Sequence, residues 1–165
     1  MAWRAPLLRA LDALRPVRPE ALHVTLCFLG WKAEEAVEPL RALVRDSAAA
    51  LGGVAGLALG EPLWLPRRRP RVLALALEDR HGQLGLLQAR LAERLAADGW
   101  YEPEMRPYLP HVTVARVHGG ASVPRGGELP AVPPLVFDGA AVTLYRSRLE
   151  RTGARYEPLF VGRLA

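Results

Sequence analysis

The chain has 165 residues, of which 50% are hydrophobic and 24% are charged, a composition typical of globular proteins and not of disordered or collagen-like ones. Its formal net charge of +5 favours anionic partners without specifying nucleic acid. The single cysteine, Cys27, excludes a disulfide framework and a multi-thiolate zinc site, and it fits a reducing, cytoplasmic compartment. No apolar run reaches the ~20 residues of a membrane span, and the N-terminal residues lack the apolar stretch of a signal peptide.

Hydrophobic patterning predicts alternating helices and strands. Apolar residues recur with helical spacing, next to Pro or Gly breakers, in segments 6–15, 33–51 and 82–98. Apolar or alternating runs predict strands over residues 21–29, 54–60, 71–78, 111–117, 137–149 and 154–164. The predicted order is αβαββαβββ, and no linker is long enough to separate independent domains. This order predicts an α+β fold in one domain covering residues 1–165.

One short motif occurs twice, about half the chain length apart. HVTL begins at His23 and HVTV begins at His111, each in a predicted strand. Because side chains alternate along a strand, His23 and Thr25 share one face, as do His111 and Thr113, while the valines between them point the other way. A single His-x-Thr would indicate little, but its recurrence predicts two similar lobes about a pseudo-twofold axis. If the lobes face each other, the four side chains converge on one cleft.

The segments HVTLCFLG, YLPHVTVAR and LYRSRL…GARYEPL resemble the 2H phosphoesterase superfamily, and within it the bacterial and archaeal 2′–5′ RNA ligases, also called RNA 2′,3′-cyclic phosphodiesterases. The resemblance covers residues 16–165 and includes Tyr108, Pro110 and Arg116 around the second motif. It implies a bilobal fold with two antiparallel sheets facing each other across a cleft, helices outside, one H-x-T motif in each lobe, and neither metal nor other cofactor.

The sequence departs from this family at its N-terminus. Relatives begin with an apolar strand before the first helix, whereas only MAWRAP precedes that helix here. We therefore expect that one sheet lacks an edge strand or that the chain starts further upstream.

Two imidazoles across a cleft suit general acid–base catalysis near neutral pH. The resemblance implies hydrolysis of RNA 2′,3′-cyclic phosphate ends to 2′-phosphates, with 2′–5′ ligation as the reverse reaction. By analogy with the family, His111 is the base toward water and His23 the acid toward the departing 3′-oxygen. Thr25 and Thr113 are placed to donate hydrogen bonds to the non-bridging oxygens, and Arg116 could add a charge-assisted contact to the same phosphate.

The sequence leaves the placement of Arg116 and Tyr108 open. Arg116 lies five residues after His111, so strict alternation puts it on the buried face unless the strand ends, twists or bulges near Ala115. The family resemblance instead favours the cleft. Tyr108 could stack on an RNA base or pack in the core.

The basic stretch 67–71 is either a tether for the RNA backbone or a solvated loop.

Other functions fit some of these residues. A lobe pair could hold a nucleotide or an RNA end without turnover, which intact H-x-T motifs do not exclude. A metallohydrolase with His23 and His111 as ligands is disfavoured, because no Asp or Glu is suitably spaced and Thr is a poor zinc ligand. A purely structural protein is disfavoured by the duplicated motif. Nothing near Cys27 would activate it, so we expect a packing residue, and no apolar stripe is left over after the core is assigned, so we expect a monomer.

Overall fold

The chain forms two compact units in the computed structural model, which describes residues 5, 12–50, 52–119, 121–123, 129, 131–150 and 153–164. Unit 1 consists of Met1–Thr25, Ala58–Glu78 and Leu109–Val136. Unit 2 consists of Leu26–Leu57, Asp79–Tyr108 and Phe137–Ala165. Each unit is thus assembled from three separate stretches of chain.

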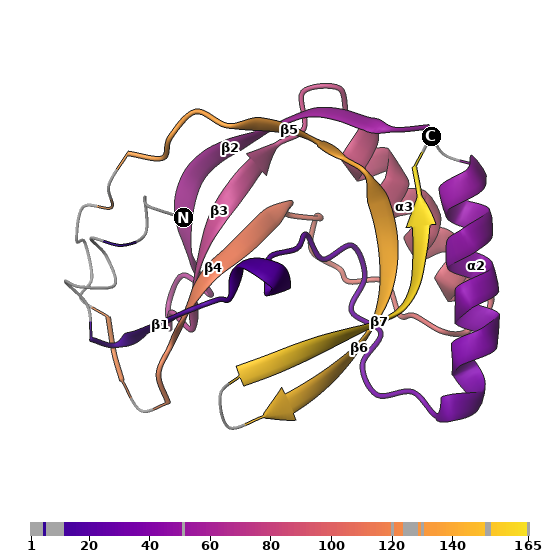
Figure 1. The fold of residues 1–165 in the computed structure, drawn as a ribbon, viewed down its shortest axis with the longest axis horizontal. Helices are drawn as coiled ribbons and strands as arrows, with labels where there is room; N and C mark the ends of the chain where they lie inside the picture. The colour runs from indigo at the N-terminus through magenta and orange to yellow at the C-terminus, as the bar shows by residue number, and fades with distance from the viewer. Residues whose placement is uncertain are drawn as a thin grey trace. The chain divides into compact units, whose positions relative to one another are not determined.

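The described elements are helices and antiparallel strands (Figure 1). In chain order they are β1 (Leu14–Pro16), the 3₁₀ turns η2 (Pro19–Ala21) and η3 (Glu34–Ala36), α2 (Val37–Ala50), β2 (Val54–Leu65), β3 (Val72–Glu78), α3 (Gln83–Ala97), β4 (His111–Val117), β5 (Val136–Gly139), β6 (Ala141–Glu150) and β7 (Gly153–Arg163). One sheet has five strands in the order β1-β4-β3-β2-β5, and the other consists of β6 and β7. The predicted α+β class with two antiparallel sheets is confirmed.

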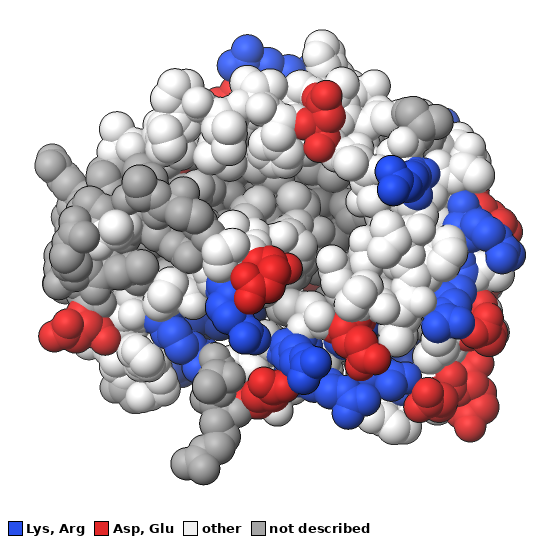
Figure 2. Space-filling model, viewed as in Figure 1, with Lys and Arg blue, Asp and Glu red and all other residues white. Residues whose placement is uncertain are grey.

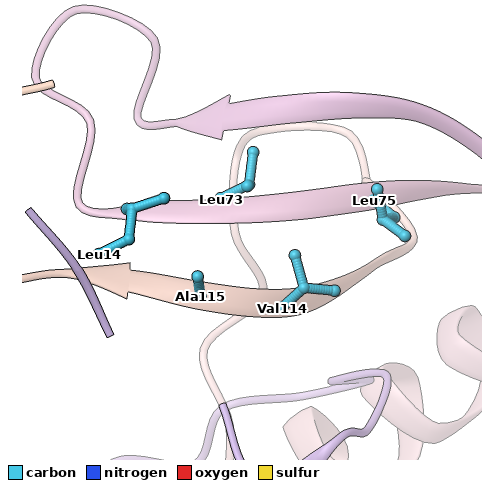
Figure 3. Close-up of a cluster of buried hydrophobic side chains, with 5 residues drawn as sticks. All are labelled: Leu14, Leu73, Leu75, Val114 and Ala115. Carbon is cyan, nitrogen blue, oxygen red and sulfur yellow. The ribbon is translucent and has the colours of Figure 1, made fainter. Parts of the chain in front are cut away.

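The core of unit 1 lies on one face of its sheet. In β3, leucines alternate with alanines, so Leu73 and Leu75 point to the same side. They form a buried cluster with Leu14 of β1 and with Val114 and Ala115 of β4 (Figure 3). β4 lies between β1 and β3 and pairs with both in antiparallel register. The cluster therefore fixes which face of β4 is buried.

Unit 2 packs its two helices through apolar stripes. The buried side chains of α2 and α3 recur at helical spacing: Leu40, Leu43, Val44 and Ala48, then Leu84, Leu87, Leu91 and Leu95. α2 lies against β6 and β7, as Figure 1 also shows. Gly162 permits this close approach, because a Cβ atom there would lie only 2.7 Å from the Cβ atom of Ala48. Within the described part of the chain, no helix is long and apolar enough to cross a bilayer.

Four predicted elements differ from the structure. The single strand expected over 137–149 is divided at Ala140 into β5 and β6, which belong to different sheets. Residues 14 and 15, expected to end the first helix, belong to β1, because Leu14 is buried by pairing with the end of β4. The expected strand 21–29 is replaced by the turn η2 and a single bridge at Val24. β2 continues beyond its predicted end to Leu65, since a register shift beside Pro62 keeps the strand paired with β3. Residues 6–11 of the first predicted helix lie outside the described residues.

Candidate active site

Both H-x-T motifs lie in unit 1, side by side. Val24 forms an antiparallel bridge with Val112 of β4. Extending this register by one residue in each direction places His23 opposite Thr113 and Thr25 opposite His111. The expectation of one motif in each lobe is therefore wrong, because the chain returns to the edge of β4 after η2 and pairs the first motif with the second.

The four motif side chains share the face of the sheet that is opposite the leucine cluster. Val112 packs against that cluster, so its neighbours His111 and Thr113 point to the other side. Val24 is the cross-strand partner of Val112 and shares its side, which puts His23 and Thr25 with the second motif. We call this side of unit 1 the histidine face. The predicted split between a valine face and a histidine face is confirmed for β4.

The two imidazoles are held in the same way. Nδ1 of His23 lies 2.8 Å from the carbonyl oxygen of Ala21, and Nδ1 of His111 lies 2.8 Å from that of Leu109. A carbonyl oxygen can only accept, so each Nδ1 carries the hydrogen and donates it. In both rings Nε2 is then the nitrogen that gains or loses the second proton. It holds a lone pair in the neutral ring and a proton in the charged one.

A β-bulge determines the side on which Arg116 lies. Ala115 pairs with Leu73, whereas Thr113 pairs with Ala74, so Val114 is an extra residue in β4. Val114 and Ala115 both belong to the buried cluster. Beyond the bulge the alternation is shifted by one residue, and Arg116 lies on the histidine face with His111 and Thr113. The strand thus bulges next to Ala115, which is one of the conditions under which the sequence allows Arg116 to leave the buried face.

The histidine face also carries a residue that sequence reasoning missed. Arg15 of β1 is the cross-strand partner of Arg116. Along β4 the face therefore presents three successive cross-strand pairs, which are Thr25–His111, His23–Thr113 and Arg15–Arg116. Arg15 could not be found from its pattern, because its segment was predicted to be helical. The stretch 67–71 joins β2 to β3 at the Arg116 end of the sheet, and Arg67, Arg68, Arg69 and Arg71 are all exposed.

Tyr108 and Cys27 belong to unit 2, close to each other. Burial is the main cause that raises the pKa of Tyr108, and the nearby charges of Cys27 and Asp79 raise it further. Burial also raises the pKa of Cys27 to about 11, against an opposing hydrogen bond with Gln88. Cys27 is half-buried, in keeping with the predicted packing role. Base stacking by Tyr108 stays a prediction. Across the described residues, no three His, Cys, Asp or Glu side chains gather closely enough to hold a metal ion.

The raised pKa of Cys27 predicts a poorly reactive thiol. The thiolate is the reactive form, so a pKa of about 11 in place of 9.0 lowers its population at pH 8 by about 100-fold. We expect iodoacetamide to alkylate native Cys27 about 100-fold more slowly than the same thiol in the urea-unfolded chain, and the native rate to rise with pH up to about 11. Mass spectrometry of timed samples measures both rates. Equal rates in the two states would contradict this burial.

The arrangement of fold and motifs agrees with comparisons to known proteins. The sequence matches the 2′-5′ RNA ligase superfamily over residues 2–151, and the chain belongs to this family. It is similar to the RNA 2′,3′-cyclic phosphodiesterase of Thermus thermophilus, with 31% identity over 172 residues covering 94% of this chain and 81% of the relative. The Escherichia coli protein of the same name is 31% identical over 165 residues, covering 95% and 83%. The crystal structure of Escherichia coli LigT complexed with 3′-AMP has a TM-score of 0.74 at 30% identity, covering 99% of this chain and 87% of that one.

Proposed function

We propose that this chain hydrolyses RNA 2′,3′-cyclic phosphate ends to 2′-phosphates without a metal or other cofactor, and that it catalyses the reverse 2′–5′ ligation with the same residues. The observation that carries the proposal is the matched pair of imidazoles on the histidine face, each of which donates a hydrogen bond from its Nδ1–H to a backbone carbonyl oxygen. Family membership and relatives named RNA 2′,3′-cyclic phosphodiesterase support the same reaction.

The tautomer that the two histidines share leaves Nε2 of each ring for proton transfer, and we assign the base and the acid by analogy with the family. Neutral His111 accepts a proton at Nε2 from the water that attacks phosphorus. Protonated His23 gives its Nε2 proton to the 3′-oxygen as the bond between phosphorus and that oxygen breaks. One P–O bond forms and one breaks, and the two rings exchange protonation states. Each role is typically worth ~10²–10⁴-fold in rate.

The neighbouring polar groups stabilise the phosphate. Negative charge accumulates on the non-bridging oxygens during attack, and donors already in place lower the energy of that state. We assign this role to the hydroxyls of Thr25 and Thr113, because each lies across from the other motif's histidine. We assign the guanidinium of Arg116 to the same phosphate, because the bulge at Val114 turns it to the histidine face.

An RNA oligonucleotide ending in a 2′,3′-cyclic phosphate tests the proposed function directly. We expect conversion to a product heavier by one water, carrying its phosphate on the 2′-oxygen, at the same rate with and without a chelator. Mass spectrometry and chromatography against 2′- and 3′-phosphate standards measure this. An oligonucleotide that is bound but returned unchanged would indicate a non-catalytic binding module instead. Loss of turnover with the chelator would contradict the cofactor-free mechanism.

The threonine roles give a separate prediction. Thr113→Val and Thr25→Val keep the side-chain shape but remove the hydroxyl, and each is expected to lower kcat by ~10²-fold or more, as for other oxyanion donors. Thr113→Ser should recover most of the loss. Thr143→Val, in β6 of unit 2, is the matched control and should leave turnover unchanged. Activity of Thr113→Val within about twofold of the unaltered protein would remove Thr113 from the mechanism.

We propose that residues 1–165 act as one functional domain and as a monomer, in a reducing cytoplasmic compartment compatible with the single cysteine. Light scattering during size-exclusion chromatography measures the oligomeric state. A dimer at assay concentration would contradict this part of the proposal and leave the chemistry untouched.

A further inference from the structure

Two arginines stand opposite each other at one end of the histidine face. Arg15 of β1 and Arg116 of β4 are direct cross-strand partners, and both are half-buried. Like charges placed directly opposite each other destabilise a sheet, and partial burial increases the cost of each charge. A bound anion between or beside the two guanidinium groups would offset this repulsion.

Many of the other described arginines differ from this pair in having an acidic neighbour. Eight have a carboxylate oxygen within 4.0 Å: Arg18, Arg41, Arg45, Arg94, Arg106, Arg146, Arg148 and Arg155. Figure 2 shows basic and acidic groups interspersed on the face that it presents. Among the residues that the structure describes, no carboxylate lies at that distance from Arg15 or Arg116. Within the described part of the chain, no acidic side chain therefore competes with an external anion for this pair.

The position of the pair matches the course of an RNA strand. Residues on one face of a strand follow one another at about 7 Å, so the Arg15–Arg116 pair lies roughly one such step beyond His23–Thr113. This step is comparable to the spacing of consecutive phosphates along an extended RNA backbone. A guanidinium is suited to phosphate because its planar fork donates two hydrogen bonds to two oxygens.

We infer that Arg15 binds the phosphodiester on the 5′ side of the terminal nucleotide, while Arg116 contacts the reacting phosphate. This inference rests on the proposed function and defines its substrate class. The site takes RNA ends with at least one internal phosphate in preference to mononucleotides. Arg15 is a binding residue for this second phosphate and takes no part in the proton transfers.

Binding of two product-like ligands tests the inference without turnover. The probes are adenosine 2′-phosphate and the dinucleotide ApA with a 2′-terminal phosphate, which differ by one nucleotide and its phosphodiester. Isothermal titration should show that Arg15→Gln weakens dinucleotide binding by ~10-fold, the scale of one charge-assisted hydrogen bond, and leaves mononucleotide binding within about twofold. The dependence of log K on log salt for the dinucleotide should also become shallower by roughly 0.7, the slope of one phosphate contact.

Arg18→Gln is the matched control, because Arg18 is exposed in the same unit and lies 3.7 Å from Glu20. It should bind both ligands as the unaltered protein does. If Arg15→Gln does not fold, Arg15→Lys replaces it. This variant keeps the charge but loses the fork, and it should lose part of the affinity for the dinucleotide and none for the mononucleotide.

The outcomes separate this inference from the proposed function. Equal losses of affinity for the two ligands would place Arg15 at the reacting phosphate. No loss of affinity for either ligand would show that Arg15 binds neither of them. Both results overturn the inference while the proposed function stands. If the unaltered protein binds neither ligand, the inference fails, while the proposed function is decided separately by turnover of the cyclic-phosphate oligonucleotide.

Discussion

Replacing either His23 or His111 with alanine is expected to lower cyclic-phosphate turnover by at least ~10²-fold, the lower end for loss of a general acid or base. Each substitution removes an Nε2 atom that the Nδ1 hydrogen bond orients toward the histidine face. The fold should survive, since both rings point away from the leucine cluster. Steady-state kinetics on a mononucleoside 2′,3′-cyclic phosphate, with circular dichroism of each variant, provide the measurement.

His81→Ala is the control for the histidine variants. His81 is exposed, it belongs to unit 2, and it lies outside both motifs. Its loss should leave turnover unchanged. If His23→Ala or His111→Ala kept activity close to that of His81→Ala, the two-histidine mechanism would be wrong.

The pH dependence distinguishes the two roles. A general base must be unprotonated, so the rate rises with pH as the base loses its proton. A general acid must be protonated, so the rate falls at higher pH as the acid loses its proton. The unaltered protein should give a bell-shaped profile. The residual activity of His111→Ala should lack the acidic limb, and that of His23→Ala should lack the alkaline limb. The reverse pattern would exchange the two assignments.

The substitution Leu73→Ala is expected to cause the largest loss of stability, lowering the free energy of unfolding by about 2–5 kcal/mol. Leu73 is 0% exposed and packs with Leu14, Leu75, Val114 and Ala115. Truncation removes buried methyl groups and leaves a cavity that a sheet paired on both sides of β3 closes only in part. Urea titration followed by circular dichroism measures the change in unfolding free energy.

Leu149→Ala is the matched control for the core variant. Leu149 also lies in a strand, β6, but its side chain is 91% exposed. We expect its replacement to change stability by no more than about 0.5 kcal/mol. Equal effects of the two substitutions would show that the cluster around Leu73 does not stabilise unit 1.

Local patterns in the sequence predicted most of the elements correctly. The apolar run 72–78 predicts a strand, and the apolar stripes of 37–50 and 83–97 predict helices with one buried side. The H-x-T spacing likewise predicted that each histidine shares a strand face with its threonine. These features depend on near neighbours in the chain, which is why the sequence alone reveals them.

The features that the sequence did not reveal depend on distant partners. Leu14 fits a helical stripe equally well, and only its pairing with Val117 makes its segment a strand. The bridge between Val24 and Val112 joins two motifs that the repeat suggested would lie in different lobes. The bulge at Val114 can be recognised only when β4 is aligned residue by residue with its partner β3, since a strand by itself shows no extra residue. Arg15 becomes a candidate only after all three are known.

The two H-x-T motifs are alike in side chains but unequal in backbone support. His111 opens a seven-residue strand that is paired on both sides, whereas the first motif lies in irregular chain after a 3₁₀ turn and meets β4 at an isolated bridge. Local opening costs least where backbone pairing is sparse, so amide hydrogens around His23 should exchange faster than those of β4. We therefore expect His23 to be the more mobile of the two histidines. His111 would then keep a fixed position, whereas His23 would have the freedom to follow a phosphate whose geometry changes during the reaction.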